Sequence, residues 1–334
     1  MKLNQLLGNN AVLQANQPVF IFGTGKGTVY VQIDNLSKAQ SFAEENWCLE
    51  LPSHSYGGPY EMRVVLNGDE QILSDIYFGD VFLLSGQSNN QVKLFETKTP
   101  KKEYQGNARL RLFTMERPED GEFFSPADGW VCAEDNNVDK WPAIGYLTGN
   151  IHSKNTDRAV GLIACYQGAS MIQSWLPKGV LVNTDLDIAS EETSGDKRVK
   201  EYLLWNHDGF LYEKMFMPIV PFGIKAVIWY QGESNTDTPD NTKEVHYGLL
   251  KMLISRWRKD LRNENLHFFI IQLPDYIYGN QEGWKAIQTA QAEVAETTEN
   301  TYCIKSSDIC ENDHIHPATK LPLAQRIADM TKKL

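Results

Sequence analysis

A serine that follows a buried hydrophobic run is the first residue of this sequence whose setting could support chemistry. Ser88 stands in the motif GQSN, residues 86–89, directly after the apolar run Val81–Leu84. Ligands of α/β proteins bind beyond the carboxyl ends of strands, and a glycine permits the tight turn that would present the Ser88 hydroxyl there. The amides of a following helix could then face an oxyanion. The alternative is that Ser88 only caps that helix.

A second candidate group lies near the C-terminus, in the segment DHIHP at residues 313–317. An alcohol needs a base of near-neutral pKa to become a nucleophile, and the imidazole of His316 suits that role. The base needs a carboxylate to fix its tautomer, and Asp313 stands three residues before it. His314 is the competing base, although its ring is expected to point the other way. The alternative is a polar loop before a helix that starts at Pro317.

Two further strand ends offer hydrogen-bond donors of the kind that stabilise an oxyanion. Gln231 and Asn235 carry amide side chains in the segment WYQGESN, after the apolar run Ala226–Ile228. Gly168 and Ala169 follow another apolar run, and a glycine lets backbone N–H groups approach closely. Taken alone, each segment could be an ordinary loop between a strand and a helix. Together, a nucleophile, a base and two donor loops form the set that acyl transfer requires.

These residues need a parallel sheet to bring them together, and the apolar pattern from residue 76 onward predicts one. Continuous apolar runs are typical of strands buried on both faces, and they occur at Val81–Leu84, Val160–Cys165, Ala226–Tyr230 and Phe268–Ile271. Helical periodicity appears in Ile144, Leu147 and Ile151, in Leu249, Leu253, Trp257 and Leu261, and in Leu323, Ile327 and Met330. Alternating strands and helices predict an α/β domain with a three-layer core over residues 76–334. An insertion is expected around residues 178–210, where the chain is polar and poorly periodic.

The first 75 residues follow a different pattern, in which apolar residues alternate with polar ones. The alternation is clear in Val29–Ile33, in Trp47–Leu51 and in Tyr60–Leu66. Period two is typical of antiparallel strands with one buried face, and turn formers such as Asn67-Gly68 separate the runs. Residues 1–75 are therefore predicted to form a small β-sandwich domain.

The composition narrows the class of partner. The net charge of −11 at pH 7 disfavours nucleic acid or an anionic membrane as the main partner, and no apolar run approaches the roughly 20 residues of a membrane helix. Five cysteines without a CxxC pair or zinc spacing predict reduced, mostly buried thiols. No metal and no cofactor are predicted, and a homo-oligomer stays open. The N-terminus lacks the apolar segment of a signal peptide, which predicts a cytoplasmic protein, or a periplasmic or secreted one if a leader was removed.

Several segments spread along the chain carry a resemblance to a known family. They are AVLQANQPVFIFGTG and GGPYEMRV near the N-terminus, then GDVFLLSGQSN, VGLIACYQGASMIQSW, FGIKAVIWYQGESN and DHIHPATKLPLAQRIA. On these segments the sequence resembles the sialic-acid O-acetylesterase group of SGNH hydrolases, which is close to the acetylxylan esterases. FGIKAVIWYQGESN is the most specific match. The resemblance implies an SGNH-type, flavodoxin-like α/β domain with a mostly parallel sheet, behind a leading β-sandwich.

The resemblance also implies roles for individual residues. Ser88 would be the nucleophile and His316 the base, with Asp313 orienting His316. The oxyanion hole would draw on the Ser88 amide, on a backbone amide at Gly168 or Ala169, and on the side chain of Gln231 or Asn235. The residues that would bind the substrate or support its pocket are Gln87, Asn89, Glu233 and Trp175.

The sequence departs from the family pattern at three places. Asn90 stands where the family commonly has Met, and Tyr166 with the single glycine Gly168 replaces the paired glycines of WGGT. His314 stands where many relatives have an Asp directly before Ile-His. These differences bear on the choice of substrate more than on the type of reaction.

The predicted reaction is therefore hydrolysis of an acetyl ester on a sugar, with O-acetylated sialic acid as the first candidate, through an acyl-enzyme on Ser88. Acetylated plant xylan is the alternative substrate. A non-catalytic carbohydrate-binding protein and an esterase for longer acyl chains also stay open, although the latter would need a long apolar groove.

Overall fold

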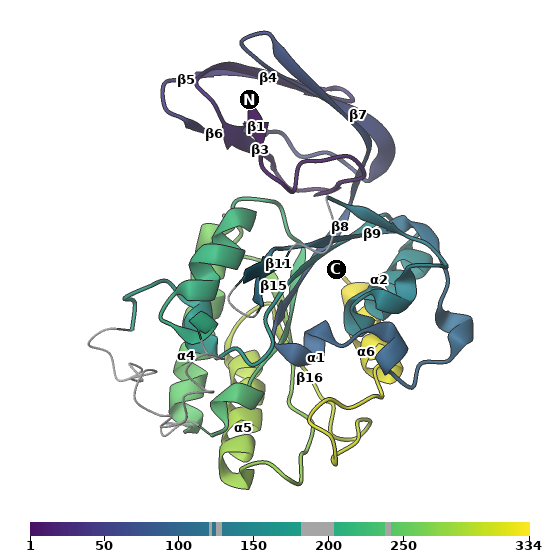
Figure 1. Ribbon diagram of the computed structural model, residues 1–334, viewed down its shortest axis with the longest axis vertical. Helices are drawn as coiled ribbons and strands as arrows, with labels where there is room; N and C mark the ends of the chain where they lie inside the picture. The colour runs from purple at the N-terminus through teal and green to yellow at the C-terminus, as the bar shows by residue number, and fades with distance from the viewer. Residues whose placement is uncertain (120–121, 125–128, 182–203, 238–241) are drawn as a thin grey trace.

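The chain forms a small all-β part near the N-terminus and a larger α/β part below it in Figure 1. The computed structural model describes residues 1–119, 122–124, 129–181, 204–237 and 242–334. Most of the insertion predicted at residues 178–210 lies outside the described residues, because 182–203 are not among them.

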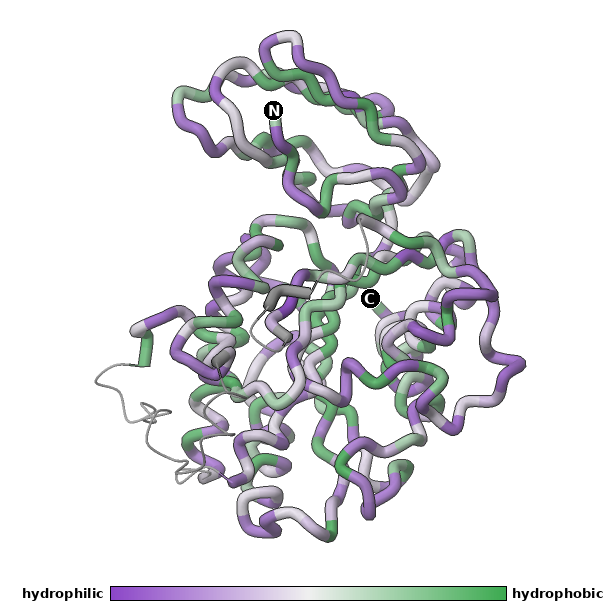
Figure 2. The backbone as a smooth tube through the Cα atoms, in the orientation of Figure 1, coloured by the Kyte–Doolittle hydropathy of each residue, from purple (hydrophilic) through white to green (hydrophobic). Residues whose placement is uncertain are grey.

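One long strand, β8 (Asp69–Gly86), organises the α/β part at the centre of a mixed, 11-stranded sheet. The main path of this sheet runs β12-β9-β13-β8-β14-β15-β16. Besides β8, this path contains β9 (Asn107–Thr114), β12 (Val131–Ala133), β13 (Val160–Tyr166), β14 (Ala226–Tyr230), β15 (His267–Ile271) and β16 (Thr301–Ile304); the other four strands of the sheet belong to the N-terminal part. All neighbours on this path pair in parallel except the edge strand β12. Every residue of β13 and β14 is buried, as the continuous apolar runs predicted. Figure 2 shows hydrophobic residues, in green, along the strands in the middle of this part.

Two pairs of helices cover the sheet, one pair on each side (Figure 1). Helix α2 (Ala143–Thr156) packs with α6 (Leu321–Thr331), and α4 (Lys243–Asp260) packs with α5 (Gln281–Thr297). The predicted apolar faces are buried at Ile144, Leu147, Leu249, Leu253, Trp257, Leu323 and Ile327. Helix α4 runs unbroken from Lys243 to Asp260, and the Thr242 side chain caps its start by accepting from the Val245 amide. The α/β fold predicted from the sequence is confirmed.

Short elements connect these strands and helices. They are α1 (Ser88–Gln91), η1 (Leu94–Glu96), η2 (Lys101–Glu103), β10 (Arg117–Glu119), β11 (Glu122–Phe124), η3 (Val138–Lys140), η4 (Ile172–Trp175), η5 (Leu204–Asn206), the π-helical η6 (Tyr212–Phe216), η7 (Met217–Ile219) and η8 (Glu233–Asn235).

Two small groups of antiparallel strands make up the N-terminal part. Strands β1 (Lys2–Leu3), β3 (Val19–Thr24) and β6 (Asn46–Leu51) form a separate three-stranded sheet. Strands β4 (Gly27–Ile33), β5 (Leu36–Phe42) and β7 (Gly57–Leu66) join the first half of β8, while β2 (Val12–Gln14) pairs with β8 in parallel. The predicted alternation is observed, since Val29, Val31 and Ile33 are fully buried and Gln32 is exposed.

Strand β8 belongs to both parts of the molecule (Figure 1). Its first half pairs antiparallel with β7, from Leu66 opposite Asp69 to Gly57 opposite Phe78. Its second half pairs in parallel with β13 and β14. The strand therefore crosses the boundary predicted between residues 75 and 76 without interruption.

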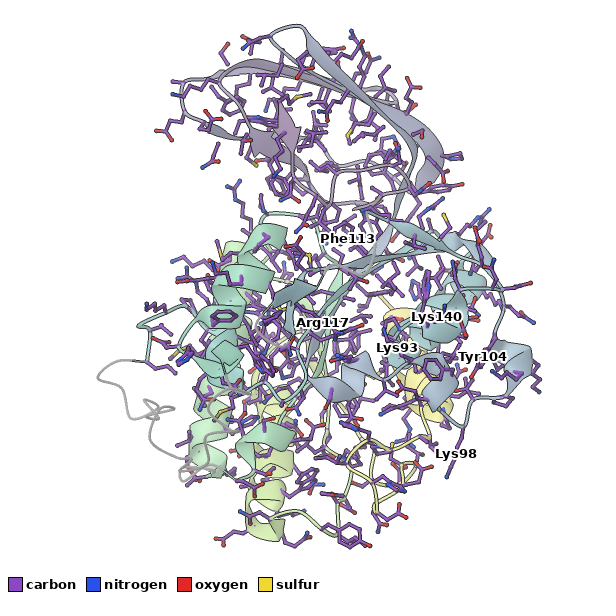
Figure 3. All side chains as sticks on the ribbon, viewed as in Figure 1. Lys93, Lys98, Tyr104, Phe113, Arg117 and Lys140 are labelled. Atoms are coloured by element: carbon purple, nitrogen blue, oxygen red, sulfur yellow. The ribbon has the colours of Figure 1, made fainter. Side chains whose placement is uncertain are left out.

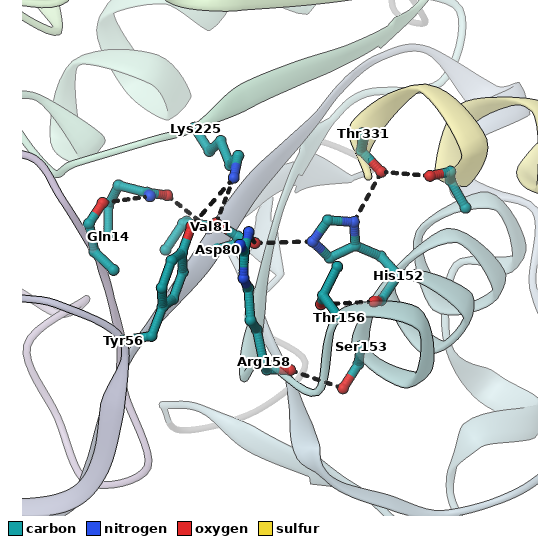
Figure 4. A network of polar contacts seen from close by, with 12 residues as sticks. Gln14, Tyr56, Asp80, Val81, His152, Ser153, Thr156, Arg158, Lys225 and Thr331 are labelled. Atoms are coloured by element: carbon teal, nitrogen blue, oxygen red, sulfur yellow. Dashed lines mark hydrogen bonds and ion pairs between the residues drawn. The ribbon is translucent and has the colours of Figure 1, made fainter. Parts of the chain in front are cut away.

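A buried polar network lies where the two parts meet, around the fully buried Asp80 of β8 (Figure 4). Lys225 Nζ and His152 Nε2 each lie 2.8 Å from an Asp80 carboxylate oxygen, and the Tyr56 hydroxyl donates to Asp80 at 2.9 Å. Burial alone would raise the pKa of Asp80, but the hydrogen bonds and charges of His152 and Lys225 outweigh it and hold the pKa well below the usual range. Tyr56 comes from the N-terminal part, so the network ties that part to the sheet.

The five cysteines are all free thiols; Cys165 is fully buried, whereas the other four are partly exposed, which is more exposure than predicted. Among the described residues, no helix is both long and apolar enough to span a membrane.

Candidate active site

Three neighbouring strands end at the same edge of the sheet. In the register of the parallel pairs, Gly86 of β8 lies beside Tyr166 of β13 and Tyr230 of β14. The backbone is drawn together beyond this point, because the Gln87 amide donates to the Tyr230 carbonyl and the Gln167 amide donates to the Gly86 carbonyl. The segments that follow these strand ends are those in which the sequence placed the nucleophile and the donor loops.

The turn before Ser88 requires a glycine. Gly86 has a φ of +116°, and a Cβ on it would lie 2.2 Å from the Tyr230 carbonyl oxygen. A side chain would therefore be strained by its backbone and would also collide with β14. The Ser88 side chain does not cap helix α1, since Ser88 is the first residue of α1 and the preceding Gln87 makes no side-chain cap. The capping alternative raised by the sequence is therefore wrong.

The structure brings the Ser88 hydroxyl to the predicted base. Ser88 Oγ lies 2.7 Å from Nε2 of His316, a hydrogen-bond distance between side chains 228 residues apart. His316 stands on the loop between β16 and α6, and the Ile315 carbonyl of this loop accepts from Asn89 Nδ2. Ser88 is half-buried, and His316 keeps part of its surface exposed although the rest is covered, so the pair is open to a substrate.

The surroundings of His316 favour the form that accepts a proton. Burial, and after it the charge of Lys320, lower the pKa of His316 below its usual value, while Glu96 acts in the opposite direction. A lowered pKa keeps the ring neutral at pH 7, and a neutral Nε2 can accept the proton of the Ser88 hydroxyl.

The predicted orienting carboxylate does not contact the base. Asp313 is exposed, and its Oδ2 lies 3.9 Å from Nε2 of His314 rather than beside His316. In the described part of the chain, the Nδ1 atom of His316 makes no hydrogen bond. The role of Asp313 therefore stays a prediction.

Of the predicted oxyanion donors, the backbone groups lie near Ser88. A Cβ built on Gly168 would be 3.8 Å from the Ser88 Cβ and 3.3 Å from Gln91 Oε1, so this loop borders the nucleophile. As the first residue of α1, Ser88 has an amide without an acceptor in its own helix. Ala169 follows with a φ of +54°, in the left-handed region that side chains other than glycine seldom adopt.

The predicted side-chain donors instead bond to each other and to the β13 loop. Both are buried, and Gln231 Nε2 donates to the Ser170 carbonyl at 3.0 Å and to Asn235 Oδ1 at 2.7 Å. Asn235 Nδ2 donates to Gln173 Oε1, and its Oδ1 also accepts from the Ile172 amide. In this arrangement they fix the loop that carries Gly168, and the two N–H groups of Gln231 are already occupied.

The four residues predicted to contact substrate are buried. Gln87 Oε1 accepts from the amides of Gly232 and Ser234 and so links the first and third loops. Trp175 is fully buried and packs edge-on against Trp229 and Trp257. The structure does not bring Trp175 to the site; its ring packs in the core, where large aromatic side chains are commonly buried.

The remaining two, Asn89 and Glu233, are joined by a hydrogen bond next to Ser88, and Lys320, a residue that sequence reasoning missed, contacts the same Asn89 side chain. Asn89 Nδ2 donates to Glu233 Oε1 at 2.6 Å, and Lys320 Nζ donates to Asn89 Oδ1 at 2.7 Å. Lys320 is only 1% exposed, and burial lowers its pKa to about 8 against the opposing effects of Cys310, Glu233 and Glu311. One sequence signal could have found it: a cation at the N-terminal end of a helix is unfavourable for the helix dipole.

Two more contacts fix the short segment that follows Ser88. Asn90 is fully buried and donates to the carbonyls of Ser85 and Ile228. Lys98, labelled in Figure 3, joins the loop of His316, since its amide donates to the Ala318 carbonyl and its Nζ lies 2.6 Å from Glu311 Oε1. In the described part of the chain, no group of three or more His, Cys, Asp or Glu side chains could hold a metal ion.

Comparisons with known proteins agree on one family. The model of the family described as carbohydrate esterase, sialic acid-specific acetylesterase matches residues 78–333. The human sialate O-acetylesterase is 26% identical, covering 96% of this chain and 68% of that protein. The mouse sialate O-acetylesterase is 23% identical, covering 96% of this chain and 71% of that protein. A carbohydrate acetylesterase from Xanthomonas citri superposes with a TM-score of 0.82 at 26% identity, covering 98% of this chain and 73% of that one.

Proposed function

This chain belongs to the sialic acid-specific acetylesterase family of carbohydrate esterases and is an esterase. From this we propose that it removes acetyl groups from the hydroxyls of a sugar, with O-acetylated sialic acid as the first candidate substrate. The nucleophile is Ser88 and the base is His316. The observation that carries the proposal is the distance of 2.7 Å between Ser88 Oγ and His316 Nε2, at the edge where β8, β13 and β14 end.

The reaction proceeds in two acyl-transfer steps. His316 takes the hydroxyl proton while Ser88 Oγ attacks the acetyl carbonyl carbon, which gives a tetrahedral oxyanion. His316 then protonates the sugar oxygen as the C–O ester bond breaks, and the acetyl group stays on Ser88. Water, deprotonated by His316, attacks the carbonyl carbon of the acetyl-enzyme. The bond between that carbon and Ser88 Oγ then breaks, His316 returns the proton to Oγ, and acetate leaves. The half-exposed setting of Ser88 supports access for a bulky sugar ester.

The oxyanion is held by backbone donors. We assign the amides of Ser88 and Gly168, with the Ala169 amide as the alternative to the latter, because this loop borders Ser88. Gln231 and Asn235 contribute by holding that loop, and either would have to give up a present partner to donate directly. Asp313 stabilises the imidazolium from the same loop, which requires its carboxylate to leave His314.

The two parts of the fold correspond to two proposed domains. We propose that residues 76–334 form an SGNH-type, flavodoxin-like hydrolase domain, and that residues 1–75 form a leading β-sandwich. The sandwich is supported by the buried residues that both N-terminal sheets contribute to one core, such as Ile21, Val31 and Leu49.

A substrate panel tests the proposal. Acetate release is followed from O-acetylated sialic acid, acetylated xylan and a chromogenic acetyl ester, for the wild type and for Ser88→Ala. We expect a preference for the sialic acid ester and a loss of at least a thousandfold in Ser88→Ala. Activity of Ser88→Ala at the wild-type rate would refute the mechanism, and the absence of acetate release by the wild type would favour a carbohydrate-binding protein. The octanoyl analogue of the chromogenic ester tests for longer acyl chains.

A further inference from the structure

One buried amide joins the nucleophile's turn to the base's loop. Asn89 directly follows Ser88, and its Nδ2 donates to the carbonyl of Ile315, the residue before His316, at 2.9 Å. The second Nδ2 hydrogen goes to Glu233 Oε1. A single side chain therefore spans the two segments whose separation sets the distance between Ser88 Oγ and His316 Nε2.

The orientation of that amide is determined by its partners. Lys320 can only donate, so it must face Asn89 Oδ1, and the Ile315 carbonyl can only accept, so it must face Nδ2. The amide dipole thus points its oxygen at an ammonium group and its nitrogen at a carboxylate. Charged partners make stronger hydrogen bonds than neutral ones, so both ends of the Asn89 amide are held firmly.

The two charged groups are costly for the fold. Lys320 and Glu233 are almost fully buried, and Glu233 Oε2 makes no hydrogen bond among the described residues. Burial lowers the pKa of Lys320 and raises the pKa of Glu233, which means that both charged forms are disfavoured where they sit. Lys320 and Glu233 meet only through Asn89, so the cost of burying each charge is not offset by a direct contact between them. A role beyond stability is therefore the better account of why position 320 carries a lysine.

We propose that Lys320 and Glu233 are positioning residues that hold the Asn89 amide from both ends, so that Asn89 keeps Ser88 and His316 within hydrogen-bond distance. The inference rests on the proposed function and deepens it. Lys320 acts through Asn89 and contacts no reacting atom.

A second effect of Lys320 reaches the base through space. Its positive charge contributes, after burial, to the lowered pKa of His316. Of the other charged groups, Glu96 acts on the His316 ring in the opposite direction. Asp313 and His314 stand three and two residues before His316 in the same loop, and Glu311 of that loop is paired with Lys98. Without the lysine charge, the pKa of His316 rises, so the base is protonated and inactivated already in less acidic solutions.

The test compares Lys320→Met, which keeps the length of the side chain and removes its charge, with Lys320→Arg and Glu233→Gln. Lys332→Met, an exposed lysine just after α6, is the matched control. For Lys320→Met we expect kcat to fall on the order of 10- to 100-fold with little change in KM, since a misplacement of about 1 Å can cost a hundredfold. The acid limb of kcat/KM should move to higher pH. Lys320→Arg should recover part of kcat, and Glu233→Gln should lose several-fold.

The thermal midpoint separates positioning from folding. Lys320→Met leaves Asn89 Oδ1 without its donor and the buried Glu233 without a nearby cation, so its midpoint should fall, and kcat is therefore compared at a temperature where both proteins remain folded. Because both residues act through Asn89, the double variant should lose about as much kcat as Lys320→Met alone. Wild-type kcat in Lys320→Met, or a loss of kcat matched by a loss of folded protein, would overturn the inference. Should Lys320→Met fail to fold, wild-type kcat in Glu233→Gln would overturn it equally.

The Ser88→Ala variant, assayed beside these, keeps the two proposals apart. If acetate release vanishes in Ser88→Ala but is unchanged in Lys320→Met, the positioning role fails and the proposed function stands. If Ser88→Ala remains active, the proposed function fails, and the positioning role that rests on it is overturned with it.

Discussion

Replacing Asp80 by Asn should destabilise the protein without changing its chemistry. Asp80 is fully buried, with Lys225 Nζ and His152 Nε2 each 2.8 Å from its carboxylate and Arg158 Nη1 at 3.3 Å. Asn keeps the shape but removes the negative charge, which leaves the Lys225 ammonium buried without its counter-ion. Figure 4 shows how these groups converge on one carboxylate.

The expected loss is large for a single substitution. Removing one partner of a buried ion pair costs roughly 3–5 kcal/mol, and each kcal/mol shifts the midpoint of a larger domain by about 2–4 °C. The midpoint of Asp80→Asn at pH 7 should therefore fall by roughly 6–20 °C. Because the pKa of Asp80 is lowered in the folded state, its stabilisation is fully present above the unfolded pKa of about 3.9 and is lost as the pH falls below it. The difference between wild type and variant should narrow in acid.

The assay pairs thermal unfolding with turnover. Asp80 and Gly86 lie on the same strand about 20 Å apart, at 3.3 Å per residue, so kcat at 25 °C should remain within about twofold of the wild type. Asp308→Asn, which removes an exposed partner of Arg326, is the control and should barely move the midpoint. A midpoint within about 2 °C of the wild type would refute the reasoning, as would a fall in kcat as severe as the loss of stability.

Two further predictions concern the site. Gly86→Ala should destabilise the fold by more than the roughly 1–3 kcal/mol of a strained backbone and impair acetate release, because its Cβ would meet the Tyr230 carbonyl. Denaturant unfolding measures this loss against the control Gly68→Ala, whose Cβ meets nothing within 4 Å. Equal losses of stability in the two variants would contradict the prediction. The acid limb of kcat/KM should lie below the pKa of about 6.5 of a free histidine, because the pKa of His316 is lowered; a limb at or above 6.5, or one retained in His316→Gln, would count against His316 as the base.

The sequence predicts most of the strands of the α/β part, but it does not show where the N-terminal part ends and the α/β part begins. Continuous apolar runs predicted β13 and β14 to within a residue, because burial on both faces leaves no room for polar side chains. The same pattern could not reveal that β8 is one strand from Asp69 to Gly86. Its surroundings change from a half-exposed antiparallel pairing to a fully buried parallel one, and a change of pattern within a strand looks like a boundary.

The sequence predicted those parts of the site whose place depends only on where a strand ends. Ser88 and Gly168 follow strand ends in register, so their proximity follows from the parallel sheet. Gln231 was harder, because an amide at a strand end can face the substrate or a neighbouring loop, and only tertiary packing selects the loop. Lys320 was missed because a lysine at the start of an amphipathic helix is ordinarily solvated. Trp175 shows the same limit, since nearness in sequence to a loop does not decide burial.

The sharing of β8 between both parts has a consequence for the order in which the chain acquires its structure. During synthesis the antiparallel partners of β8 precede it, so its first half can pair at once with β7. The second half, Val81–Leu84, cannot pair on either side until β13, which starts at Val160, and β14, which starts at Ala226, have been synthesised. Such long-range parallel pairing is slow and leaves an apolar strand unprotected while the rest of the chain is made. Newly made chains are thus most prone to aggregate through this strand, before the site exists.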